Sequence, residues 1–241
     1  MSPRLPSVAH WAGAAIVAIS VLSVLPGTAH GAPDGLSIST QGANGAPACM
    51  LCHGAHGEGN PVANFPRLAG AGAAYLKEQL DAIASGSRVS PVMAAIAKTL
   101  EPAQREAVAR FYASLPLPLD TDRLAATALQ SPKADDVGAW LAVRGAWDRN
   151  IPACNQCHGP GGIGVGAHFP SLAGQPATYI AEQLRLWREN RRPPGPLDLM
   201  ASVATRLSDA EIDAVSAYYA GLPKTADPLA TQASTAAKAK P

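Results

Sequence analysis

The feature that most constrains this chain is a five-residue motif that occurs twice. Residues 49–53 read Cys-Met-Leu-Cys-His, and residues 154–158 read Cys-Asn-Gln-Cys-His, 105 positions further along. The two copies contain all four cysteines of the 241-residue chain. Any account of the fold must therefore explain why a histidine directly follows each pair of cysteines.

Paired cysteines at this spacing are used in three ways. In an oxidising compartment they form disulfides, and two such pairs together can hold zinc. Neither use requires the histidine. A Cys-x-x-Cys-His run is typical of covalent haem c attachment, in which two thiols bond to the haem and the next imidazole binds iron. We therefore predict two haem c groups, with disulfides or zinc as the alternatives. The predicted attachment residues are Cys49, Cys52, Cys154 and Cys157, and the predicted iron ligands are His53 and His158.

The rest of the chain repeats in step with the motif. The sequence Phe-Pro-Arg-Leu-Ala-Gly at 65–70 recurs as Phe-Pro-Ser-Leu-Ala-Gly at 169–174, and later segments keep an offset of 104 to 107 residues. Self-similarity over so long a period indicates homologous structural units. We predict two domains, at 32–116 and 135–223, joined by a linker at 117–134.

Helical spacing of apolar residues dominates both repeats. No strand pattern is evident, so the predicted fold class is all-α, and Gly/Pro-rich loops follow each motif. Ser208 and Glu211 form a predicted capping box, and Pro102 suits a first helical turn. The helices are expected at 73–85, 102–115, 136–148, 176–190 and 208–222, with a short one within 38–47.

The second axial ligand of each iron is predicted from the scarcity of methionine. Met50 lies between two haem-bonded cysteines and cannot easily reach over the ring. Met93 and Met200 occupy matching positions in the repeat, each in a predicted loop. A thioether paired with histidine gives a saturated iron with a raised potential, which suits electron transfer. We also expect a backbone carbonyl beside Pro66 or Pro170 to orient each histidine.

The ends of the chain carry their own predictions. Residues 1–31 resemble a secretory signal, with Arg4 followed by an apolar run at 12–25; an uncleaved anchor is the alternative. Removing them leaves 18 basic and 18 acidic residues. This balance lacks the basic excess of a nucleic-acid-binding protein. The tail at 224–241 has little to bury and is predicted to be disordered. Export predicts a periplasmic location.

These motifs together resemble the diheme class I cytochromes c of the cytochrome c4 type. The resemblance covers residues 36–223 and implies two tandem class I cytochrome c domains, each wrapped around one haem. It implies a soluble or loosely membrane-attached periplasmic carrier between a quinol-oxidising complex and a terminal oxidase. The ligand pairs that it implies are His53 with Met93 and His158 with Met200.

Two further functions remain open at this point. The chain could be the haem subunit of a periplasmic dehydrogenase, because the haem chemistry is the same and only the partner surface differs. It could also be a diheme peroxidase-like enzyme or a sulfur-compound dehydrogenase. An enzyme of that kind needs an open or displaceable iron ligand, whereas both repeats offer a methionine in register. We therefore expect an electron carrier and not an enzyme.

Overall fold

The computed structural model describes residues 34–222, and all of its regular secondary structure is helical. Within this range the only β-type pairings are isolated bridges, so the all-α prediction is confirmed. The predicted signal at 1–31 and the predicted tail at 224–241 lie outside the described residues. No helix in the described range is long and apolar enough to span a membrane. We call residues 34–116 the first half and residues 117–222 the second half.

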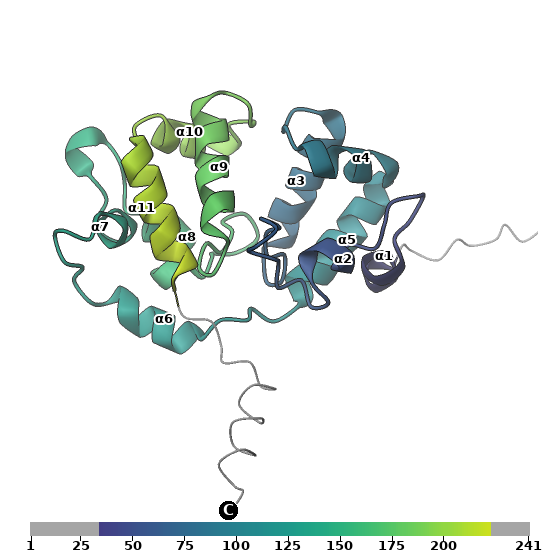
Figure 1. Ribbon diagram of the computed structural model, residues 1–241, viewed down its shortest axis with the longest axis horizontal. Helices are drawn as coiled ribbons and strands as arrows, with labels where there is room; N and C mark the ends of the chain where they lie inside the picture. The colour runs from purple at the N-terminus through teal and green to yellow at the C-terminus, as the bar shows by residue number, and fades with distance from the viewer. Residues whose placement is uncertain (1–33, 223–241) are drawn as a thin grey trace, which may run out of the picture. The chain divides into compact units, whose positions relative to one another are not determined.

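The first half is built around three longer helices (Figure 1). Helix α3 packs against both α4 and α5, and α1 packs against α5. The buried core includes Ile38, Leu76, Val108 and Tyr112. The helices of this half are α1 (Gly35–Gln41), α2 (Met50–His53), α3 (Ala73–Ser85), α4 (Pro91–Thr99) and α5 (Pro102–Ser114).

The second half repeats this arrangement with additional short elements (Figure 1). Helix α11 packs against α7 and α9, and α10 packs against α9. Ile151, Ile212 and Tyr219 are almost fully buried in its core. The elements are α6 (Thr121–Ala128), α7 (Val137–Val143), η1 (Trp147–Arg149), α8 (Cys154–His158), η2 (Pro160–Gly162), α9 (Ala177–Arg188), η3 (Pro196–Asp198), α10 (Leu199–Ala204) and α11 (Asp209–Ala220).

Most of the predicted helices are present, and the local signals explain their ends. The capping box of Ser208 and Glu211 opens α11, and Pro102 occupies the first turn of α5. The helix predicted at 136–148 is wrong in its second part. Gly145 has a φ of 73°, which ends the helix and leaves α7 and η1 as separate elements.

The prediction that each methionine lies in a loop is also wrong. Met93 lies in α4 and Met200 lies in α10. Pro91 starts α4, and the alanines that follow are strong helix formers, so a short helix forms where the sequence seemed to continue as loop.

The segment at 117–134 contains helix α6, which the sequence pattern did not predict. Leu119 and Leu124 from this segment are buried in the core of the second half. Helix α6 also packs against η2, which directly follows the second Cys-x-x-Cys-His motif. Residues 117–134 therefore connect the two halves and also contribute to the core of the second half.

Two buried arginines connect the halves, and the first of them is Arg88. Its guanidinium donates to Gln79 Oε1 in the same half at 3.0 Å. It also donates across the junction, to Tyr179 Oη at 3.1 Å and to Gln183 Oε1 at 2.7 Å. A planar guanidinium can serve several acceptors at once, so one side chain joins α3 to α9.

Arg192 makes the reciprocal set of bonds from the second half. It donates to Gln183 Oε1 in its own half at 3.1 Å. Across the junction it donates to Gln79 Oε1 at 2.9 Å and to Tyr75 Oη at 3.3 Å. The guanidinium also lies 3.7 Å from the ring centre of Trp187, a cation–π contact. Each arginine thus bonds to the glutamines of both halves.

Candidate functional site

Each motif histidine is held by a backbone carbonyl. His53 Nδ1 lies 2.9 Å from the carbonyl oxygen of Pro66, and His158 Nδ1 lies 2.8 Å from that of Pro170. A carbonyl can only accept, so Nδ1 carries the proton in both rings and Nε2 is left with a lone pair. This is the usual outer support of a metal-binding imidazole. The predicted orienting carbonyls are confirmed.

The protonation state of both rings also suits metal binding. Burial lowers the pKa of His53 and of His158, although the bond to the proline carbonyl opposes this. Both imidazoles are therefore neutral at neutral pH, which is the form that binds iron. Nε2 of His158 is buried and has no hydrogen-bond partner. A buried polar atom without a partner is rare, and an iron atom would satisfy it.

The four cysteines are not joined by disulfides, so that alternative is not supported. Nor do His, Cys, Asp and Glu residues gather into a metal-holding cluster anywhere in the described range. Burial raises the pKa of the Cys49 thiol, and it raises that of Cys154 to about 11. Both side chains therefore lie in apolar surroundings, which suit the attachment of an apolar macrocycle.

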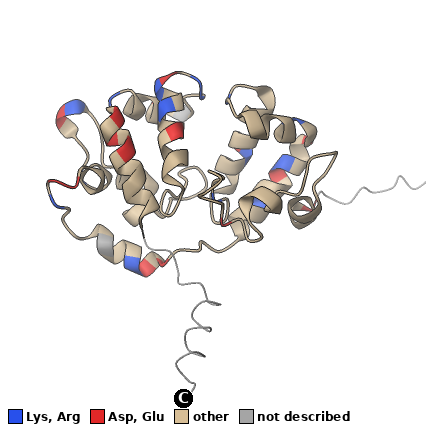
Figure 2. Cartoon of the chain, in the orientation of Figure 1, with Lys and Arg blue, Asp and Glu red and all other residues tan. Residues whose placement is uncertain are grey.

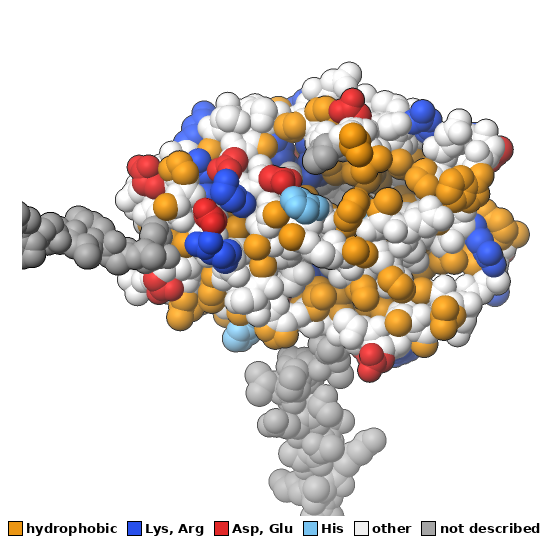
Figure 3. All heavy atoms as spheres, turned by 180° about the vertical axis from the view of Figure 1, so that it is seen from behind, with side chains coloured by type: hydrophobic (Ala, Val, Ile, Leu, Met, Phe, Trp, Pro, Cys, Tyr) orange, Lys and Arg blue, Asp and Glu red, His pale blue; other side chains and the backbone are white. Residues whose placement is uncertain are grey.

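One cavity receives nearly all of the predicted site residues. Its walls are largely apolar, and Figure 3 shows hydrophobic side chains around a hollow on one face of the molecule. Cys52 is the predicted site residue that does not line it. The predicted residues that do are Cys49, His53, Met93, Cys154, Cys157, His158 and Met200.

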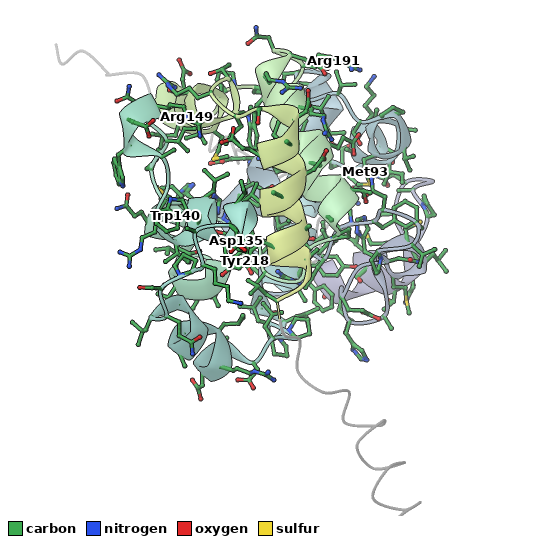
Figure 4. All side chains as sticks on the ribbon, turned by 60° about the vertical axis from the view of Figure 1, so that its left-hand side comes forward. Met93, Asp135, Trp140, Arg149, Arg191 and Tyr218 are labelled. Atoms are coloured by element: carbon green, nitrogen blue, oxygen red, sulfur yellow. The ribbon has the colours of Figure 1, made fainter. Side chains whose placement is uncertain are left out.

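Both methionines reach this cavity from short helices. Met93 lies near the start of α4 (Figure 4), and Met200 occupies the matching place in α10. Each helix follows a longer one, α3 or α9, and packs against it. The residues present therefore fit a haem in each half, with a histidine on one helix and a methionine on another.

Two arginines, Arg88 and Arg192, line the same cavity, and the sequence analysis missed Arg88. The signal was available, because the two residues align in the repeat at an offset of 104. For Arg192 the sequence alone favours a solvated helix face shared with Arg185 and Arg188, with contact to haem propionates or an acidic partner as the alternative. In the structure those two pair with acidic residues of α11, whereas Arg192 is buried. Figure 2 shows the acidic positions of α11 as red bands.

Comparison with known proteins decides the family. The pattern of the cytochrome c family matches residues 41–116 and again residues 151–222. The chain belongs to the cytochrome c family. It carries two covalently bound haem c groups, one for each match, and its function is electron transfer.

Individual relatives place the chain among the diheme, c4-type members of the cytochrome c family. The chain is 35% identical to cytochrome c4 of Pseudomonas aeruginosa, over 86% of this chain and 98% of the relative. It is 46% identical to a thiosulfate dehydrogenase electron acceptor of Stutzerimonas stutzeri, over 88% of this chain and 95% of the relative. Both relatives are thus matched over nearly their full length.

A solved structure gives the same result for the fold. Thiosulfate dehydrogenase (TsdBA) from Marichromatium purpuratum superposes with a TM-score of 0.67 and is 40% identical in sequence. The match covers 78% of this chain but only 40% of that protein, so this cytochrome c corresponds to less than half of it.

Proposed function

We propose that the haem iron of the first half is bound by His53 and Met93, and that of the second half by His158 and Met200. The carrying observation is that each histidine has Nδ1 bonded to a carbonyl and Nε2 free, beside a cavity that its methionine also lines. Cys49 and Cys52 would form thioether bonds to the haem of the first half, and Cys154 and Cys157 to the haem of the second half. Cys49 and Cys154 occupy equivalent places at the start of α2 and α8.

Arg88 and Arg192 supply the polar part of this site. Both guanidiniums are buried, line the cavity and make no ion pair to a carboxylate within the described residues. Burying a cation is costly unless it is paired. The haem propionates are anions and would supply the missing negative charge. The two arginines would therefore bind and orient the propionates.

The closed ligand sets support one-electron transfer and not catalysis. An enzyme acting at iron needs an open or displaceable ligand position, and both halves supply a methionine. The protein's own residues fix the histidine tautomers and surround the haems with apolar side chains. We therefore propose that the isolated chain turns over no substrate.

We propose that the electron donor is a thiosulfate dehydrogenase. The supporting observation is that the electron acceptor of such an enzyme is 46% identical to this chain over nearly its full length. Cytochrome c4 is 35% identical over a similar range. The likeness to part of TsdBA is consistent with the same pairing. On this proposal the chain acts in the periplasm, after removal of its signal.

A second candidate is the general cytochrome c4 role. Its support is the near-complete coverage of the P. aeruginosa relative. In that case the donor would be a quinol-oxidising complex and the acceptor a terminal oxidase, with the protein soluble or loosely attached to the membrane. The two candidates share the haem sites and differ only in the partner.

The ligands are tested by spectroscopy of the holoprotein produced with a haem c maturation system. We expect two covalent low-spin haems per chain with the charge-transfer band of methionine ligation. Met93→Ala and Met200→Ala should each remove half of that band and produce one reduced haem that binds carbon monoxide. If either variant keeps the full band, that methionine is not a ligand.

The donor is tested by mixing the oxidised holoprotein with a thiosulfate dehydrogenase and thiosulfate. We expect rapid reduction that depends on the enzyme, and no reduction by thiosulfate alone. A quinol-oxidising complex with quinol provides the matched comparison. Faster reduction by that complex would favour the c4 role, and reduction by thiosulfate without the enzyme would mean that the chain is itself catalytic.

A further inference from the structure

A third arginine lies buried between the two halves, in the loop that orients His53. Arg67 directly follows Pro66, whose carbonyl accepts the histidine proton, and only 3% of Arg67 is exposed. Its Nη1 donates to the carbonyl of Ala69 in the first half at 2.5 Å. Its Nη2 donates to the carbonyl of Ala173 in the second half at 3.1 Å.

These two acceptors are equivalent residues of the repeat. Ala69 and Ala173 are separated by the same offset of 104 as the surrounding motif, Phe-Pro-x-Leu-Ala-Gly. One guanidinium therefore bridges matching points of the two loops that hold the histidines. The position equivalent to Arg67 is Ser171, so the second half has no arginine of its own there.

Further hydrogen bonds join Arg67 to residues of the second half. Arg67 Nη2 donates to Ser171 Oγ at 2.9 Å, and that hydroxyl donates to the carbonyl of Gly162 at 3.0 Å. The side chain of Gln175 also pairs with the Arg67 backbone, accepting from its N–H and donating to its carbonyl, each at 2.9 Å. The side chain is thus held firmly, beside the loop whose Pro170 carbonyl orients His158.

The guanidinium of Arg67 remains charged and pairs with no carboxylate of residues 34–222. Burial lowers the pKa of Arg67 to about 10, which still leaves it protonated at neutral pH. All of its bonds go to neutral oxygens, Nε has no partner, and no carboxylate in the described range forms an ion pair with it. Charge acts over a longer range in such buried surroundings than in water.

We infer that the buried positive charge of Arg67 raises the reduction potentials of both haems together. A reduced site carries one more negative charge than an oxidised one, and a fixed cation between the two histidine loops favours it in each half. The inference needs the two haems, which the family match gives, but it does not depend on which protein is the donor.

The test is a spectroelectrochemical titration of the diheme holoprotein and its Arg67→Met variant. Methionine retains much of the side-chain volume but no charge. We expect both reduction potentials to fall by ~59 mV. For one electron this is a tenfold increase in the ratio of oxidised to reduced haem at a given applied potential. Arg67→Lys, which keeps the charge, should retain most of both potentials. Arg206→Met removes an exposed cation from the second half and should change neither potential.

The outcomes are distinguishable from a structural role and from failure of the proposed donor. The charge-transfer band of methionine ligation must persist in the variant, because its loss would lower a potential for a different reason. Unchanged potentials, or a fall in only one of them with the band intact, would overturn the inference. If Arg67→Met does not fold, Arg67→Gln gives the same charge comparison while keeping a donor for Ser171. No electron donor protein is needed in any titration.

Discussion

In the first half only α1 precedes the Cys-x-x-Cys-His helix, whereas α6, α7 and η1 all precede it in the second half. The histidines are nevertheless oriented in the same way, by a proline carbonyl at 2.9 Å and 2.8 Å. The additional chain changes what surrounds them, because Leu119 and Leu124 add to the core of the second half alone.

The difference shows how two copies of one site can acquire different properties. In the second half Nε2 of His158 is buried without a partner, and the apolar core around it is extended by Leu119 and Leu124. Burial around a haem is one of the means by which a protein sets its potential. A drier site disfavours the more positive, oxidised iron, so we expect the second half to have the higher potential.

The largest effect is expected from removing one pair of cysteines. Cys49→Ala with Cys52→Ala, or Cys154→Ala with Cys157→Ala, should each reduce the covalent haem content from two per chain to one. The remaining haem can then be titrated alone. We expect the potential measured for the second half to exceed that of the first by ~59 mV or more, a tenfold preference. Equal potentials would remove the proposed consequence of enclosure.

Helix α6 provides the next test of the comparison. Leu124 is fully buried, so Leu124→Ala should leave a cavity and lower the free energy of unfolding by about 2–5 kcal/mol. Leu129 lies just after the same helix and is 89% exposed. Leu129→Ala should therefore change the free energy of unfolding by no more than about 0.5 kcal/mol. Urea unfolding of the holoprotein measures both. Similar small losses for the two variants would show that α6 only tethers the halves.

The junction itself can be tested at Gly72. A Cβ added there would lie 2.2 Å from the backbone oxygen of Ala167 in the second half. Gly72→Ala should therefore force the two backbones apart and cost about 1–3 kcal/mol. At Gly221 the nearest atom to an added Cβ is 3.3 Å away, so Gly221→Ala is the matched control. Thermal unfolding of both variants gives the comparison, and equal midpoints would mean that the junction adapts freely.

The smallest expected effect is on stability in acid, and it compares the last helix of each half, α11 and α5. Arg149 on η1 (Figure 4) bonds to Glu211 and lowers its pKa to about 2. The folded pKa lies below the usual value of about 4.3, so this stabilisation is present above pH 4.3 and is lost as the pH falls toward 2. Glu211→Gln should accordingly destabilise the protein at pH 7 and converge with the wild type near pH 2.

The equivalent helix of the first half supplies the control. There the third position of the capping box is Gln104, whose Oε1 accepts from the Glu101 N–H at 2.8 Å. An amide does not titrate, so Gln104→Ala should lower stability by a similar amount at each pH. Acid-unfolding curves that stay parallel for the wild type and Glu211→Gln would contradict the assigned pKa.

The sequence predicted what depends on local chemistry. The haem motifs, the repeat, the longer helices and the orienting carbonyls all follow from short-range patterns such as Phe-Pro-x-Leu-Ala-Gly. It failed where a short helix has too few residues to show a period, as with α4, α6 and α10. It could not choose between a solvated face and a haem contact for Arg192, since a buried guanidinium and a solvated one look identical in sequence until their acceptors are known.

The crossed bonds of Arg88 and Arg192 have the symmetry of an isologous dimer, in which the same patch of each subunit meets itself. Two separate copies of a one-haem chain with this surface could make the same contacts. Joining the copies through residues 117–134 turns that association into an intramolecular one with a high effective concentration. The tandem chain can therefore keep its two redox centres together at any dilution, which a dissociating pair of carriers could not do.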